Sequence, residues 1–269
     1  MGSILRADFF RMWKSKSTII GLIVCCTAPI VINLLYFAIV LMTKALSGEE
    51  TATIFEMAIN ARTIIGMSYS TGNNMGFIIP MFAAIFICSD INSGMLRNKI
   101  IAGKPRKQIF TSYLICSGFL NLIYITAYTS IMAGVSLLFF KYGKTVDSAE
   151  VINLVYYVIS GTVAFLFLST VSLFFSLTTG NSALSIVFTI VFCFALGIVT
   201  TIILLIPFSD EQYEVAKYFL AVIPTNTATL NTGGVDNTPT FLVGLFSMLG
   251  FGTLNAFLAY TIFAHKELK

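Results

Sequence analysis

Charged residues are scarce in this sequence. Only 10% of the 269 residues are Asp, Glu, Lys or Arg, whereas 57% are hydrophobic and the mean hydropathy is +0.89. A water-soluble domain of this length carries roughly a quarter charged residues to cover its surface. The shortage therefore argues against a water-soluble fold and indicates a protein whose outer surface is in contact with lipid.

The chain also lacks a basic domain and a disulfide framework. The net charge of +4 is spread over short clusters between apolar runs, which is typical of membrane topology and argues against a nucleic-acid partner. The number of cysteines is odd, and all of them lie inside apolar runs rather than in exposed, oxidising loops. We interpret them as small apolar packing residues. They are Cys25, Cys26, Cys88, Cys116 and Cys193.

Residues for catalysis are missing as well. The only histidine, His265, follows the last apolar run and has no partners for acid–base chemistry or metal binding. No G-x-S-x-G motif is present. Gly103-Lys104 is followed by Pro105 and lacks the other residues of a P-loop. We therefore predict no enzyme activity, no cofactor, no metal and no ATP site in this chain.

Six uncharged apolar runs are long enough, or nearly so, to cross a bilayer, whose core of about 30 Å needs about 20 helical residues. They are continuously apolar, without the alternation of a barrel strand. We predict an all-α integral membrane protein with six transmembrane helices and a kink at Pro80 in the second, which is the shortest. The runs are 18–43, 73–89, 109–140, 151–179, 182–207 and 240–264.

The distribution of Lys and Arg predicts the orientation. With the N-terminus inside, 11 of the 16 basic residues fall in cytoplasmic segments. Both termini are therefore expected in the cytoplasm, and the segments 44–72 and 208–239 outside. The first contains apolar residues at roughly helical spacing, and part of the second, 215–223, is apolar enough to enter the interface.

Residues 1–17 precede the first run, and residues 18–269 form the predicted transmembrane domain. Residues 2–17 predict an amphipathic helix that lies in the inner interface with Trp13 at the headgroups. The alternative is an unstructured basic leader that only sets topology. The apolar face contains Leu5, Phe9, Met12 and Trp13, and Ala7, Asp8, Arg11 and Lys14 lie largely opposite.

Charge is also absent from the interior of all six runs. Ion-coupled carriers usually need a titratable group near the midplane, which disfavours such a carrier here. Uncharged polar residues do occur, and we expect them to form hydrogen bonds between helices rather than to line a path for cargo. They are Asn33, Asn121, Asn153, Asn255, Ser160, Thr162, Ser169, Thr170, Ser172 and Ser176.

The segment between the second and third runs differs from the other connections. Apolar and basic residues at helical spacing predict a short amphipathic helix over about 93–102, which Gly103 ends as a C-cap and Pro105 prevents from continuing. The apolar side chains of this helix need a surface, which is either the headgroup layer or another protein.

This segment resembles the coupling region of ABC-2-type permeases, the membrane subunits of ATP-driven exporters. Asp90, Gly94, Leu96, Arg97 and Gly103 match the family's pattern, although Asp90 stands where Glu is common and Met95 where Thr is common. The basic leader, the six spans and the apolar outer segment before the last span, which resembles a re-entrant element of that family, extend the similarity to the whole chain.

The resemblance implies a permease subunit of a bacterial plasma-membrane exporter for an amphipathic or lipophilic cargo, such as a drug or an antimicrobial-type peptide. It implies two ATPase subunits that bind ATP and Mg²⁺, and a second permease, identical or homologous. An ion-coupled secondary transporter and a non-transporting scaffold subunit remain alternatives. The residues expected to contact the ATPase are Ser93, Gly94, Met95, Leu96, Arg97, Asn98, Lys99, Ile100 and Ile101.

Overall fold

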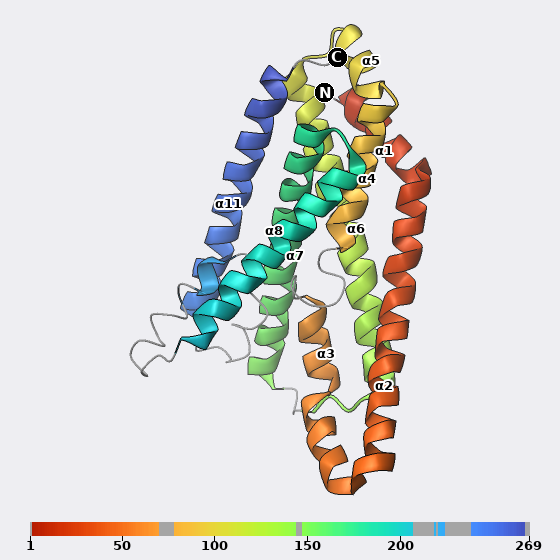
Figure 1. The fold of residues 1–269 in the computed structure, drawn as a ribbon, viewed down its shortest axis with the longest axis vertical. Helices are drawn as coiled ribbons and strands as arrows, with labels where there is room; N and C mark the ends of the chain where they lie inside the picture. Colours follow the sequence, from red (N-terminus) through yellow and green to blue (C-terminus); the bar gives the residue numbers. More distant parts are fainter. Residues whose placement is uncertain are drawn as a thin grey trace.

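A computed structural model describes residues 2–69, 78–143, 147–206, 218, 220–223 and 238–266. The protein is all-helical, and none of the described residues lies in a strand. The long helices form a bundle (Figure 1). The elements are α1 (Gly2–Lys14), α2 (Lys16–Ala58), α3 (Ala61–Ser68), α4 (Ile78–Asn92), α5 (Met95–Ile101), α6 (Arg106–Phe139), α7 (Ser148–Thr179), α8 (Ser182–Leu205) and α11 (Thr238–His265).

Among the described residues, five helices are long and apolar enough to cross a membrane, and the bent pair α4–α5 raises the number to six if it forms one span. The chain is therefore a multi-pass helical membrane protein. The five spans match the predicted runs closely; they are Lys16–Leu46, Arg106–Phe139, Glu150–Thr179, Ser182–Ile203 and Pro239–His265. The described beginning and end of the chain lie at the same end of the bundle (Figure 1), which we call the terminal end; the opposite one is the far end.

The first membrane-spanning helix, α2, is longer than the predicted run over 18–43. α2 includes 43 residues, and beyond its span the chain turns back at the far end and leads to α3 (Figure 1). α3 starts where Asn60 accepts a hydrogen bond from the Thr63 backbone while the Thr63 side chain accepts one from the Asn60 backbone, a capping box. The helical spacing noted in the segment 44–72 thus corresponds to real helix over 44–58 and in α3.

Pro80 is the third described residue of α4, and residues 70–77 before the helix lie outside the described residues, so the predicted kink at Pro80 stays a prediction. The bend that the described residues do contain lies between α4 and α5, which meet at 58°. Gly94 occupies the left-handed region there, with φ of 71°, which a residue without Cβ adopts at little cost.

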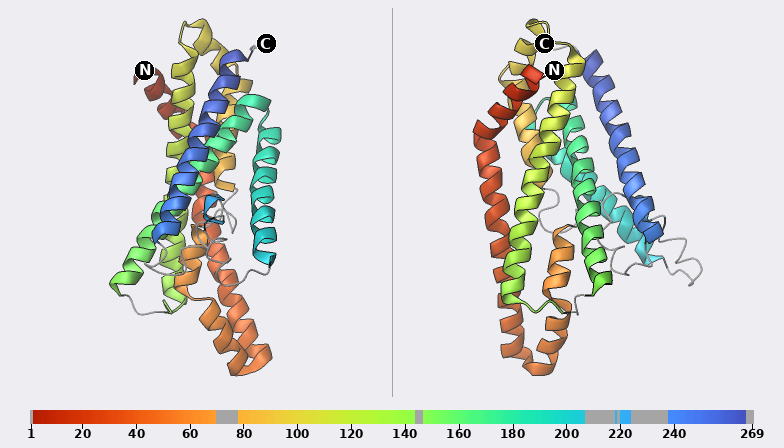
Figure 2. Two further views of the ribbon diagram at one scale, coloured as in Figure 1. Left: turned by 90° about the vertical axis from the view of Figure 1, so that its left-hand side faces the viewer. Right: turned by 180° about the vertical axis from the view of Figure 1, so that it is seen from behind.

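α6 is the central helix of the bundle and packs against α2, α3, α4 and α7 (Figure 2). One of its faces is fully buried and includes Tyr113, Leu120 and Tyr124. A Cβ on Gly21 of α2 would lie 2.6 Å from the Tyr124 hydroxyl, so only glycine permits this approach of the two helices. Close backbone approach is a usual source of helix association in lipid.

Polar residues join helices at a few points, as expected from the sequence. Asn255 of α11 donates to Thr170 of α7 at 3.2 Å, and the hydroxyls of Ser176 and Ser185 join α7 to α8 at 2.8 Å. Many other hydroxyls donate to carbonyls of their own helix, as Ser160 does to Tyr156 at 2.6 Å. All five cysteines are free, which confirms the absence of disulfides.

Candidate functional site

The short helix α5 lies at the terminal end and is delimited by two left-handed glycines. Asn98 N donates to Gly94 O at 3.0 Å as the helix begins. At its end, Gly103 has φ of 74°. Lys104 N donates a hydrogen bond to Lys99 O at 3.2 Å, as in a Schellman motif. Gly103 therefore ends the helix as predicted, and α5 falls within the predicted range 93–102.

One face of α5 packs into the protein. Leu96 is only 3% exposed and belongs to the main buried cluster, against which Ile100 also packs. Arg97 and Asn98 are exposed, and Ile101 is 74% exposed. The expectation that Leu96 offers its apolar surface to another protein is therefore corrected: its side chain is buried inside the chain, because α5 lies against α4 and its neighbours. Ile100 is only partly buried.

Charged and polar side chains of four helices meet beneath α5. We call this set the ionic cluster; it consists of Asp8 and Arg11 of α1, Asp90 of α4, Lys99 of α5, and Ser112 and Tyr113 of α6. Both carboxylates are almost fully buried, with Asp8 at 0% and Asp90 at 2% exposed. Asp8 is 91 residues from Lys99 in the sequence and Arg11 is 79 from Asp90, so the cluster exists only in the folded chain.

Each carboxylate oxygen of the cluster accepts a hydrogen bond. Lys99 Nζ donates to Asp8 Oδ1 and Ser112 Oγ to Asp8 Oδ2, both at 2.7 Å. Arg11 donates to both oxygens of Asp90, through NH1 to Oδ2 at 3.1 Å and through NH2 to Oδ1. Tyr113 accepts from Lys99 Nζ at 3.2 Å and donates to Asp90 Oδ2 at 3.0 Å.

The electrostatics of the cluster are balanced. Two carboxylates face one guanidinium and one ammonium, and a buried charge is tolerated when it is both paired and hydrogen-bonded. Removal of one partner leaves an uncompensated buried charge, which costs about 3–5 kcal/mol. The cluster thus joins α5 firmly to α1, α4 and α6.

The cluster also shows that part of the prediction for residues 2–17 is wrong. α1 is a helix, but Asp8 is buried in the bundle and Arg11 reaches Asp90, although both were assigned to the face opposite the apolar one. Met12 is fully buried, as expected for the apolar face, whereas Trp13 is 53% exposed. The partners of Asp8 and Arg11 lie on other helices, so the pattern within residues 2–17 could not reveal them.

A groove of about 360 Å³ lies between α1 and α5 next to the cluster. Arg11 of α1 and Lys99 of α5 contribute charged side chains to its lining. Its lining residues are Ile4, Ala7, Asp8, Arg11, Met95, Asn98, Lys99, Ala102 and Lys104.

Two further basic residues at the terminal end cap helices. Arg106 NH1 donates to the carbonyls of Phe263, Ala264 and Lys266 at 3.2, 2.6 and 2.9 Å, at the end of α11. Lys266 Nζ donates to the carbonyls of Leu177 and Thr178 at the end of α7, at 2.7 and 2.8 Å. Such cations satisfy carbonyls that lack an intrahelical donor. Burial lowers the pKa of Lys266.

The remaining predicted positions carry no chemistry of their own. His265 is exposed, and its Nδ1 lies 2.8 Å from Thr261 O. Ser93 donates weakly to Asp90 O at 3.4 Å. No group of three His, Cys, Asp or Glu side chains is arranged to hold a metal in the part of the chain that the structure describes. Most of the outer segment 208–239 lies outside the described residues.

The fold and the site define a multi-pass helical membrane protein with a short, internally anchored helix at the terminal end. No protein-family model matches the chain, and no curated protein matches its sequence. The assignment of a function therefore depends on the residues and on the geometry described above.

Proposed function

We propose that the chain is the permease subunit of an ABC-2-type exporter that moves an amphipathic or lipophilic cargo across the bacterial plasma membrane. The observation that supports it best is the anchoring of α5. This short helix presents Arg97, Asn98 and Ile101 at the terminal end, while Leu96 and Lys99 connect it to the helices of the bundle.

The proposed mechanism follows from this connectivity. An ATPase subunit binds the exposed face of α5 and the neighbouring groove, and its closure on ATP and Mg²⁺ displaces α5. Lys99 passes the displacement to Asp8 of α1, and Leu96 passes it to the buried cluster that includes residues of α4 and α6. Two ATPases and a second permease, identical or homologous, complete the assembly. The terminal end is then the cytoplasmic one.

The exposed residues of α5 provide the first test. The chain is tagged, purified from its native membrane, and the eluate is assayed for ATP hydrolysis. Arg97→Glu combined with Ile101→Asp should lower the hydrolysis that co-purifies at least tenfold, because both side chains project away from the protein. Lys107→Glu, an exposed change in the first turn of α6, is the matched control and should have no effect. An eluate of the unaltered chain without ATPase activity contradicts the proposal.

An ion-coupled carrier is the second candidate, because buried carboxylates such as Asp8 and Asp90 serve proton relays in some transporters. Both carboxylates lie at one end of the bundle and are matched by cations, which favours a structural role. The two candidates differ in their energy source. Accumulation of a lipophilic dye in inverted vesicles should require ATP and persist when proton and sodium gradients are dissipated; loss under dissipation favours the carrier.

A further inference from the structure

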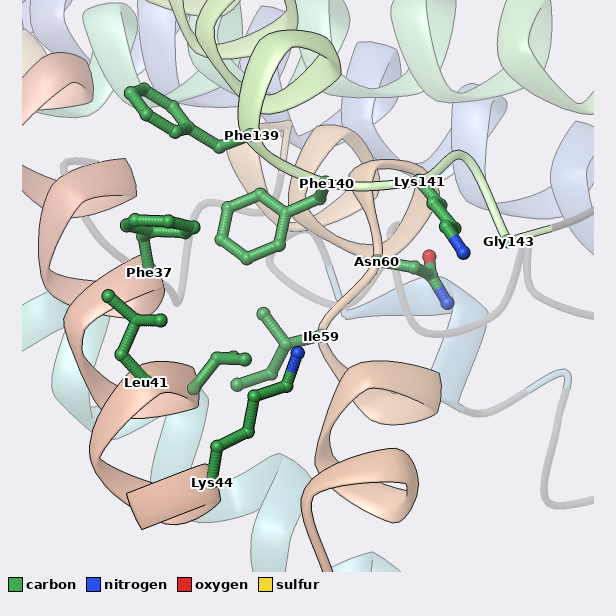
Figure 3. Close-up of a pocket in the computed structure, with 10 residues that line it drawn as sticks. Phe37, Leu41, Lys44, Ile59, Asn60, Phe139, Phe140, Lys141 and Gly143 are labelled. Atoms are coloured by element: carbon green, nitrogen blue, oxygen red, sulfur yellow. The ribbon is translucent and has the colours of Figure 1, made fainter. Parts of the chain in front are cut away.

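A cavity of about 470 Å³ lies at the far end of the bundle, away from the ionic cluster. Figure 3 shows that three segments enclose it: the last turns of the α2 span, the junction of α2 and α3, and the end of α6 with the residues that follow. The lining residues are Phe37, Val40, Leu41, Lys44, Ile59, Asn60, Phe139, Phe140, Lys141 and Gly143.

The wall of this cavity is apolar and aromatic. The ring of Phe37 lies 5.1 Å from that of Phe139 and 6.4 Å from that of Phe140, between centroids. Leu41 and Ile59 extend the apolar surface on the side of α2 and of the α2–α3 junction (Figure 3). A surface of this kind accommodates a hydrocarbon chain, and a bilayer supplies such chains at high concentration.

The rim of the cavity is cationic. Lys44 and Lys141 are exposed, and Figure 3 shows the ammonium of Lys44 beside Ile59 and that of Lys141 beside the amide of Asn60. Lys44 lies in the last turn of the span Lys16–Leu46, and Lys141 follows closely on the span Arg106–Phe139. Both charges therefore lie at the far-end limits of two candidate spans, next to which headgroups are expected.

Backbone contacts fix the position of the segment that forms the rim. Ala61 N donates to Lys141 O at 3.0 Å, which fixes the segment after α6 against the start of α3. Gly143 has φ of +83°, and a Cβ there would lie 2.8 Å from Asn60 Cγ. The backbone that carries Lys141 is thus positioned on the α2–α3 junction.

We propose that this cavity binds an anionic phospholipid. One acyl chain packs against Phe37, Phe139 and Phe140, and the phosphate lies at the rim with Lys44 and Lys141. Basic pockets between membrane helices recognise anionic headgroups in this way, and the apolar wall selects a lipid over a free anion. The proposal does not depend on the transport function, since it needs only a bilayer around the far end.

Fluorescence quenching tests this proposal, because the chain contains a single tryptophan. Trp13→Phe combined with Phe140→Trp places one reporter in the cavity wall. The protein is reconstituted in vesicles with brominated phosphatidylglycerol or brominated phosphatidylcholine, and the ratio of the two binding constants is measured. We expect the anionic lipid to be preferred by at least about tenfold, since each lysine near the surface contributes to the attraction.

Substitutions of the two rim lysines test the proposal directly. Lys44→Gln with Lys141→Gln should reduce the preference to about onefold, whereas Lys44→Arg with Lys141→Arg should keep it. Lys16→Gln with Lys107→Gln removes two exposed lysines from the opposite ends of the same two helices, and it should leave the preference unchanged. A preference that survives the Lys44 and Lys141 change, or that falls equally in this control, overturns the proposal.

Two further measurements complete the test. If inorganic phosphate at millimolar concentration displaces the brominated anionic lipid, the rim is a free-anion site and the proposal is wrong. Native mass spectrometry of the chain without a reporter substitution guards against a reporter that perturbs folding. It should show anionic phospholipid retained by the unaltered protein and by the Lys16/Lys107 control, and lost from the Lys44/Lys141 glutamine variant.

Discussion

The two ends of the bundle use buried charge differently. At the terminal end, every carboxylate oxygen of Asp8 and Asp90 accepts a hydrogen bond, and the donors come from α1, α5 and α6. At the far end, Arg62 of α3 pairs with Glu150 of α7, and Tyr142 donates to the same oxygen, Oε1, at 3.3 Å. The comparison shows that a cluster of charges unites four helices at one end, while the Arg62–Glu150 pair joins a short helix to a long one at the other.

The titration behaviour of the far-end groups reflects the same pair. The hydrogen bond with Glu150 raises the pKa of Arg62, which therefore stays charged at every accessible pH. Burial raises the pKa of Tyr142, and the nearby charge of Glu150 adds to the effect. The guanidinium of Arg62 therefore remains a charged partner for Glu150 across the accessible pH range.

The largest expected effect is that of Asp90→Asn. It removes the carboxylate that faces Arg11 and Tyr113 and leaves two cations with one buried acid, at a cost of about 3–5 kcal/mol in the free energy of unfolding. Thermal unfolding in detergent measures it. Reversal of the pair, with Arg11→Asp and Asp90→Arg, should recover part of the loss in a double-mutant cycle. A smaller loss of stability for Asp90→Asn than for Glu150→Gln would contradict the expected difference between the two ends.

Glu150→Gln should cost less, about 1–3 kcal/mol, because the amide oxygen can still accept from Arg62 and Tyr142, whereas Asp90 accepts from two nitrogens of Arg11 and from Tyr113. The effect should concentrate on α3. Hydrogen exchange followed by mass spectrometry should show faster exchange in α3 and unchanged exchange in α5. Equal acceleration of both short helices would mean that the two ends are energetically coupled.

The same substitution at two left-handed glycines refines the comparison. Gly103→Ala meets nothing within 4 Å and should cost only the backbone penalty of about 1–2 kcal/mol. Gly143→Ala has the same backbone cost and also displaces Asn60, whose Cβ lies 2.9 Å from the added methyl group. We expect a lower unfolding temperature for Gly143→Ala than for Gly103→Ala. The reverse order contradicts the close contact at the far end.

The smallest effect should come from Ile101→Ser. This side chain is 74% exposed, so the free energy of unfolding should change by no more than about 0.5 kcal/mol. Leu96→Ala, one turn earlier and buried, should cost about 2–5 kcal/mol and serves as the contrast. Similar losses for both variants would show that a partner subunit covers Ile101 in the purified protein.

Long apolar runs and the ends of helices were the predictable part of the fold. Continuous hydrophobicity identifies a span without reference to any partner, and Gly103 ended α5 as predicted because C-capping is a local property. The part of α2 beyond residue 46 was not predicted as helix, since it carries polar residues outside the apolar run.

The candidate site was predictable only in part. The short helix followed from local spacing, but its orientation did not, because the side that faces inward depends on the helices that surround it. Lys99 and Asp8 are 91 residues apart, and Arg11 and Asp90 are 79 apart. The charge pattern of a single helix contains no information on such pairs. The only available signal was the presence of Asp8 and Asp90 among the basic residues of segments that were predicted to lie on the same side of the membrane.

The cap formed by Arg106 has a consequence for the order of biosynthesis. Arg106 begins α6, whereas the three carbonyls that it binds lie at the end of α11 or directly after it, in a part of the chain that is translated later. Until α11 is made, this guanidinium lacks those partners. A fragment cut before α11 should be degraded faster in pulse–chase labelling than the same fragment with Arg106→Gln, because only the former carries the unmatched cation.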